Sequence, residues 1–179
     1  MYCGGNVGVF IDVFKPSSRL LLVGGGHIAL ALHNMAPQLG FSVVVVDDRK
    51  EYASKERFPK ASSVLQMEYD EPGLAELVGE NTFVVIITHA HKGDKLALAS
   101  LLKTKTAYLG MIGSRTKVAK IFSDLKEEGV EEEELAEVHS PIGLDIGAES
   151  PEEIALSIMS EIVAVRNKGQ TPLNSMKNK

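Results

Sequence analysis

The stretch Arg19–Asp47, RLLLVGGGHIALALHNMAPQLGFSVVVVD, decides the fold of this chain. Its first part, Arg19–Gly24, is continuously apolar, which predicts a strand buried on both faces. His27–Leu39 follows with apolar residues at helical spacing, and a proline and a glycine mark its end. Ser42–Asp47 then places four consecutive valines before an acid, a second buried strand. A strand, a glycine-rich turn, a helix and another strand form one unit of a parallel sheet.

The same alternation of strands and helices continues toward the C-terminus. Further strands are expected at Ala61–Gln66, Thr82–Thr88, Thr106–Leu109 and Ala136–His139. Further helices are expected at Pro72–Val78, Lys92–Lys103, Ser114–Glu128 and Ser150–Asn167. Alternating strands and helices predict an α/β fold with a doubly wound, mostly parallel sheet, in which a ligand binds beyond the carboxyl ends of the strands. The acidic stretch Glu127–Glu137 is expected to be a solvated linker or helix end.

The two ends of the chain depart from this pattern. In residues 1–18, apolar residues alternate from Val7 to Val13, which predicts an extra strand at the sheet edge or exchanged between protomers. Residues 19–169 are expected to form a single nucleotide-binding domain. Residues 170–179 are polar and are expected to form a disordered tail.

Composition excludes several classes of protein. The chain has 179 residues, 44% hydrophobic and 24% charged, which suits one globular domain. Its net charge of −5 without a basic block argues against nucleic-acid binding. No apolar run approaches the roughly 20 residues of a membrane span, and no signal peptide opens the chain, so a cytoplasmic protein is expected. The single cysteine, Cys3, excludes a disulfide scaffold.

The glycine loop is the clearest candidate binding site. Gly24-Gly25-Gly26-His27-Ile28-Ala29 fits the G-x-G-x-x-G/A pattern of Rossmann folds, and Asp47 lies 21 residues after Gly26, near the expected spacing. A pyrophosphate can approach Gly26 closely and bind the free amides of the helix N-terminus. Asp47 would then bind a ribose diol, or Arg49 a 2′-phosphate. A glycine turn that has lost its ligand is the plainer alternative, and His27 either touches the ligand or caps the helix.

Three later loops fall where this fold places its chemistry. Thr88-His89-Ala90-His91 follows one strand, but two histidines make an incomplete metal site, so polar ligand binding or capping is favoured and no metal is expected. Gly110–Arg115 offers a second anion site, unless Arg115 only pairs with a surface acid. His139–Gly147 is expected to form a pocket wall. The chain shows no nucleophile elbow, no P-loop lysine and no nucleophile–base pair, so no reaction can be named.

These motifs, taken in order, resemble one known family. The glycine loop, Val46-Asp47-Asp48-Arg49, Thr88–His91, Tyr108–Arg115 and His139–Gly147 are similar to the Rossmann domain of the xanthine dehydrogenase accessory factor family (XdhC/CoxI). The resemblance implies a chaperone role in the maturation of molybdenum hydroxylases such as xanthine dehydrogenase or carbon monoxide dehydrogenase. Such proteins bind the molybdenum cofactor, protect it during sulfuration and pass it to the apo-enzyme. The expected cofactor-binding residues are Gly24, Gly25, Gly26, His27, Ile28, Asp47, Asp48, Arg49, Thr88, His89, Gly113, Ser114 and Arg115.

The resemblance also gives the first residues a meaning. In the family, Cys-Gly-Gly follows a smaller N-terminal domain, whereas here Cys3-Gly4-Gly5 opens the sequence, so that domain is expected to be absent. A homodimer, or a partner that supplies the domain, is therefore expected. The Cys3 thiolate either ligates molybdenum or carries sulfur, or Cys3 is only a small junction residue.

The sequence leaves two other functions open. An NAD(P)-dependent oxidoreductase would use His89 or His91 as proton donor, and a nucleotide-sensing domain would bind without either activity. The ligand is accordingly NAD, NADP or a molybdopterin dinucleotide.

Overall fold

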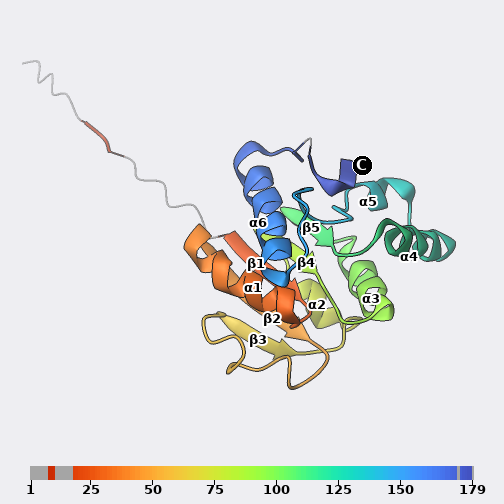
Figure 1. Cartoon of the computed structure of the whole chain (residues 1–179), viewed down its shortest axis with the longest axis horizontal. Coiled ribbons are helices and arrows are strands. Elements are labelled where there is room, and N and C mark those ends of the chain that lie inside the picture. The colour runs from red at the N-terminus through yellow and green to blue at the C-terminus, as the bar shows by residue number, and fades with distance from the viewer. Residues whose placement is uncertain (1–7, 11–17, 173, 179) are drawn as a thin grey trace, which may run out of the picture.

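A computed structural model describes residues 8–10, 18–172 and 174–178. Figure 1 shows a parallel sheet between two layers of helices. The strands are β1 (Ser18–Val23), β2 (Phe41–Asp47), β3 (Ser63–Gln66), β4 (Thr82–Ile86) and β5 (Tyr108–Met111). They lie in the order β3-β2-β1-β4-β5, and every neighbouring pair is parallel. This order reverses its direction at β1, which confirms the doubly wound α/β fold.

The central strand β1 explains why the sheet is buried on both faces. Leu20 and Leu22 point into one apolar cluster, while Leu21 and Val23 point into the other, and all four are fully buried. Because side chains alternate along a strand, a continuous apolar run is what a sheet covered on both sides requires.

The helices divide between the two faces. They are α1 (His27–Met35), α2 (Pro72–Glu76), α3 (His91–Leu101), α4 (Arg115–Glu127), α5 (Glu132–Ala136) and α6 (Pro151–Lys168). Figure 1 shows α1 and α6 side by side over one face of the sheet, where residues such as Leu32 and Ile158 fill the first cluster. Helices α3 and α4 cover the other face with residues such as Leu98 and Ile121.

Two helix signals of the sequence, the stop at Gly40 and the start at Ser150, agree with the structure, whereas α1 itself ends at Met35, four residues before the expected Leu39. α1 passes at Ala36–Leu39 into a 3-10 turn that contains Pro37, and Gly40 ends it with φ of 79°. Ser150 caps α6, whose capping box is completed by Glu153. These residues supply the local stop and start signals that helices need.

The expected strand at Ala136–His139 is wrong. The acidic stretch instead forms the short helix α5, in which Glu131 and Glu134 make a capping box. Acids at a helix N-terminus are favourable because of the partial positive charge there. Of the expected strand, only His139 pairs with the sheet, through a single parallel bridge to Gly110.

The two ends of the chain also differ from the core. Most of the extra strand expected near Val7–Val13, and Cys3, lie outside the described residues; residues 8–10 are described, exposed and not in a strand. The expectation of a disordered tail is wrong for the described residues after Gly169, because Ser175 is fully buried and Met176–Asn178 form a 3-10 turn. No helix among the described residues is long and apolar enough to cross a membrane.

Candidate functional site

The candidate site lies at the carboxyl ends of β1 and β4, where the strand order reverses. Gly24 ends β1 with φ of +115°, and a Cβ there would lie 2.3 Å from the carbonyl oxygen of Ile87. Its N–H donates to Val46 at 2.7 Å, while the N–H of Ile87 donates to Val23 at 2.8 Å. Gly24 is therefore required by the fold itself, because the turn packs directly on the backbone of the neighbouring strand.

Gly25 ties the turn to the connection between β2 and β3. Its N–H donates to Asp47 Oδ2 at 2.6 Å, and its carbonyl oxygen accepts from Arg57 Nε at 2.8 Å. A Cβ on Gly25 would lie 2.5 Å from the carbonyl oxygen of Tyr52. Sequence reasoning missed Arg57, because nothing in a loop of mixed polarity marks one arginine as the partner of a backbone carbonyl that lies 32 residues earlier in the chain.

Gly26 differs from both, because its surroundings are open. It is the N-cap of α1 with extended backbone, and a Cβ built on it meets no atom within 4 Å. Within the described residues, the N–H groups of His27 and Ile28 have no acceptor, and the first turn of α1 carries no acid. Ala29, in the first turn of α1, is fully buried, as close packing of the helix on the sheet requires. The start of α1 therefore presents free amides and a partial positive charge to an incoming anion.

Asp47 and Arg49 bind each other. Fully buried Asp47 accepts from the Arg49 backbone N–H at 2.9 Å, from Nε at 2.9 Å and from Nη2 at 3.0 Å, besides Gly25. Burial opposes ionisation of Asp47, but the hydrogen bonds from Arg49 and Gly25 hold its pKa below the usual value. The guanidinium of Arg49 also stacks on Tyr52, 3.7 Å from the ring centre. A contact of either group with a ribose or its phosphate stays a prediction, and it requires Arg49 to turn away.

Asp48 and His89 meet across the crevice from the ends of β2 and β4. His89 Nδ1 lies 3.8 Å from Asp48 Oδ1, which also accepts from the Tyr69 hydroxyl at 3.1 Å. Burial, followed by the negative charge of Asp47, raises the pKa of Tyr69 and keeps it a hydroxyl donor. The fold thus brings together two residues that the sequence predicts for the site.

Thr88 is held by a buried acid at the start of α3. Its N–H and Oγ1 donate to Asp94 Oδ1 at 3.0 and 2.8 Å, and the other oxygen of Asp94 forms an ion pair with Lys117 of α4. Asp94 therefore fixes the end of β4. Sequence reasoning missed Lys117, although its place in the first turn of α4 brings it close to the strand ends. No group of three or more potential metal ligands occurs among the described residues.

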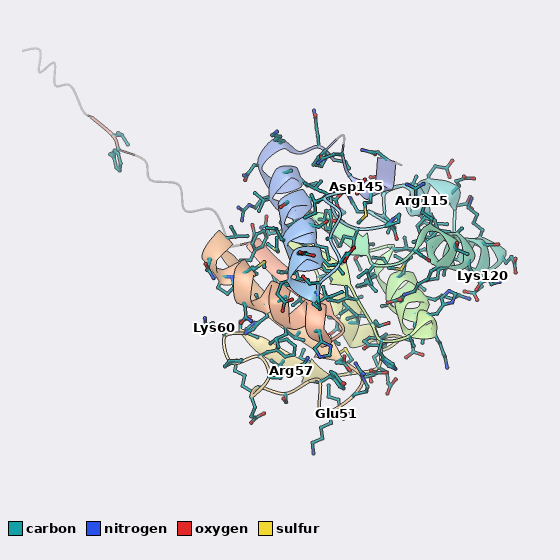
Figure 2. The ribbon with its side chains drawn as sticks, in the orientation of Figure 1. Glu51, Arg57, Lys60, Arg115, Lys120 and Asp145 are labelled. Atoms are coloured by element: carbon teal, nitrogen blue, oxygen red, sulfur yellow. The ribbon has the colours of Figure 1, made fainter. Side chains whose placement is uncertain are left out.

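Another candidate region, with a hollow of its own, follows β5. Ser114 caps α4 by accepting from the N–H of Lys117 at 3.2 Å, and Arg115 is exposed beside it. Arg115 lines a hollow of about 260 Å³ together with Gly113, Pro141, Asp145 and others. Figure 2 shows Arg115 and Asp145 in the same region of the molecule, beyond the end of β5. The expected pocket wall at 139–147 thus faces a hollow.

Glu161 of α6 anchors that wall and was missed from the sequence. Fully buried, it accepts from the Tyr108 hydroxyl, from the Gly143 N–H at 2.9 Å and from the Ser175 hydroxyl. Burial opposes its ionisation, but His139, whose Nδ1 lies 3.8 Å from Oε1, and the hydrogen bonds from Ser175, Tyr108 and Gly143 lower the pKa of Glu161 to about 2. One carboxylate therefore joins β5, the 139–147 connection and the C-terminal residues.

The reversed strand order and the open start of α1 define this chain as a Rossmann-type domain. The family described as the XdhC Rossmann domain matches residues 20–162, most of the chain. The chain belongs to the XdhC family.

Three relatives and one solved structure extend this result. The chain is 39% identical over 166 residues to the uncharacterized protein YqeB of Escherichia coli K12, covering 92% of this chain and 30% of the relative. It is 33% identical to a probable xanthine dehydrogenase subunit of Bacillus subtilis, covering 89% and 46%. It is 27% identical to the molybdenum cofactor insertion chaperone PaoD of E. coli K12, covering 91% and 45%.

The solved structure is a crystal structure described as a xanthine dehydrogenase from Bacillus halodurans. It superposes with a TM-score of 0.75 at 28% identity, covering 89% of this chain and 46% of that one. The chain thus spans less than half the length of each of these relatives.

Proposed function

We propose that this chain is an accessory domain in the maturation of a molybdenum hydroxylase, and that it holds the nucleotide form of the molybdenum cofactor at its glycine loop. The open start of α1 at Gly26, in a domain of the XdhC family, carries this proposal. Two relatives support the biological setting, because one is described as a cofactor insertion chaperone and the other as part of a xanthine dehydrogenase.

The residues at the glycine loop fit a pyrophosphate. The unpaired amides of His27 and Ile28 are donors, Gly26 has no Cβ to obstruct them, and the absence of an acid in the first turn of α1 leaves the local charge positive. His89, whose Nδ1 lies 3.8 Å from Asp48 Oδ1 and whose side chain is 44% exposed, is available to a bound ligand. When bound, the cofactor supplies the redox chemistry of the hydroxylase, while these residues bind and orient its phosphates.

The partners follow from the same proposal. An apo-hydroxylase would receive the cofactor, and a second copy of this chain or a separate protein would complete the assembly. Dimer formation, a cytoplasmic location and a role for Cys3 as thiolate ligand or sulfur carrier stay predictions of the sequence.

The test is the identity of the ligand that purifies with the protein. Heat-released ligand is analysed by mass spectrometry, and the protein is assayed for reconstitution of a purified apo-hydroxylase. A pterin with an attached nucleotide, together with reconstitution, is the expected result. Release of a nicotinamide dinucleotide, without reconstitution, would instead favour an NAD(P)-dependent oxidoreductase. Release of a simple nucleotide, without reconstitution, would favour a nucleotide-sensing domain.

A further inference from the structure

The hollow beyond β5 is built from three separate segments. It is lined by Gly113, Ser114, Arg115, Pro141, Asp145 and Met176. These residues come from the start of α4, from the 139–147 connection and from the C-terminal segment. The hollow therefore exists only in the folded chain.

Its walls are held in place by backbone hydrogen bonds. The Met176 N–H donates to the Gly143 carbonyl at 2.9 Å, and the Asp145 N–H donates to the Asn174 carbonyl at 3.0 Å. Glu161 fixes the same connection through the Gly143 N–H. The positions of Asp145 and Met176 are thus set before any ligand arrives, which lowers the entropic cost of binding.

The hollow lies on the β5 side of the switch point. A ligand whose phosphates rest on the start of α1 runs across the carboxyl ends of the strands, one end toward β3 and the other toward β5. On the β3 side, Asp47 is already saturated by Arg49 and Gly25. The β5 side offers the hollow with Arg115 and Asp145 on its surface.

The two charged side chains in the hollow select against simple ions. A bare phosphate is repelled by Asp145 and a bare cation by Arg115. A flat ring that carries N–H donors next to a carbonyl acceptor satisfies both, because a carboxylate accepts from paired N–H groups and a guanidinium donates to the carbonyl. Pro141 and Met176 supply apolar surface for the faces of such a ring.

We propose that this hollow is a subsite for the 2-amino-4-oxopyrimidine edge of a pterin or guanine ring, with Asp145 accepting from the ring N3–H and 2-amino group (N1–H and 2-amino group in guanine) and Arg115 donating to the 4-oxo group (6-oxo in guanine). The proposal deepens the proposed function and rests on it. A carboxylate has room for up to about four hydrogen bonds, so ring binding is compatible with the interaction that Asp145 has within the chain.

The test compares two rings of the same shape. Pterin carries the 2-amino group, whereas lumazine has a carbonyl in its place, and both are fluorescent probes for titration of the full chain. We expect pterin to bind the wild-type protein at least about fivefold more tightly than lumazine. This ratio corresponds to the lower limit of the discrimination that one bidentate hydrogen-bonded contact provides. Guanosine monophosphate, compared with the adenosine form, tests whether a nucleotide base also fits.

The Asp145→Asn variant sharpens the test. An amide accepts from N3–H and donates to the 2-carbonyl of lumazine, so the preference for pterin should disappear or reverse. Such a reversal cannot result from misfolding, which would weaken both probes. Asp70→Asn, the same change at an exposed position between β3 and α2, should keep the wild-type preference.

Equal affinity for pterin and lumazine in the wild type, or an unchanged preference in Asp145→Asn, overturns the proposal. This result is separable from failure of the proposed function. If the purified protein carries a cofactor-type ligand but Asp145→Asn shows no change in preference, the subsite alone is wrong. If the pterin preference follows Asp145 but a Gly26 variant still reconstitutes the hydroxylase, the glycine-loop proposal is wrong and the subsite stands.

Discussion

Replacing Gly26 by leucine separates ligand binding from folding. Gly26 has φ of −70° and ψ of −166°, a conformation that any residue adopts, and a Cβ there meets no atom within 4 Å. It caps α1 without a side-chain hydrogen bond, so leucine loses only the modest cap preference of glycine, about 1 kcal/mol or less. The free energy of unfolding should change by no more than that.

The effect on a phosphate ligand should be much larger. A leucine at Gly26 has open space around its Cβ, next in the chain to the unpaired amides of His27 and Ile28, and we expect its side chain to obstruct a phosphate there. A hydrogen bond from an amide to a charged group is worth about 1.5–3 kcal/mol, so loss of both costs roughly 3–6 kcal/mol. This corresponds to a roughly 10²- to 10⁴-fold weaker affinity.

The measurement is calorimetric titration with the ligand identified by mass spectrometry, beside urea unfolding of the same preparations. Gly79→Leu is the matched control, because its Cβ also meets no atom within 4 Å and it lies before β4, at the opposite end of the strands. Wild-type affinity in a well-folded Gly26→Leu protein, or equal weakening in both variants, would refute the assignment of the phosphates to the start of α1.

Three further substitutions test the structure around the site. Gly24→Ala places an alanine at a positive φ, with its Cβ 2.3 Å from the Ile87 carbonyl oxygen. The free energy of unfolding in urea should therefore fall by more than about 1 kcal/mol, the cost of backbone strain alone. An unchanged free energy of unfolding would contradict the close contact between the two strands. Asp47→Asn removes the nearer acid of Arg49, whose guanidinium is 26% exposed and keeps Asp48 Oδ1 at 3.6 Å. The loss of stability should be about 2–3 kcal/mol, less than for a fully buried pair because Arg49 retains Asp48 and can turn to solvent. Glu161 has its pKa lowered from 4.5 to about 2, so it contributes about 3 kcal/mol above pH 4.5 that is lost as the pH falls toward 2. Between pH 4.5 and 2, the free energy of unfolding should change less with pH in Glu161→Gln than in the wild type. The same pH dependence in both proteins would show that the carboxylate is not stabilised by folding.

The sequence predicts the elements well because their signals are local. The apolar runs of β1 and β2, the stop at Gly40 and the caps at Ser114 and Ser150 each depend on a few neighbouring residues. The wrong strand at 136–139 shows the limit of this reasoning, since a run of four residues carries too little periodicity to separate a strand from a helix end.

Side-chain partnerships across the fold were beyond local patterns. The sequence suggests Asp47 and Arg49 as alternative contacts to a ligand, but the two residues lie two positions apart at one strand end and bind each other. Glu161 reads as one acid on a long helix, yet it meets Tyr108, 53 residues away, only because β5 and α6 pack together. Such contacts depend on strand order and helix placement rather than on spacing in the chain.

The sequence by itself determined the doubly wound sheet, the glycine loop at the end of β1 and the family to which the motifs belong, because hydrophobic period and glycine spacing act within a few turns of chain. Only the tertiary structure decided which of three adjacent glycines is open to a ligand. Gly24 presses on Ile87 and Gly25 on Tyr52, while Gly26 faces open space. The tertiary structure likewise turned a tail expected to be disordered into the wall of a hollow, since burial of Ser175 on Glu161 requires elements that are distant in sequence.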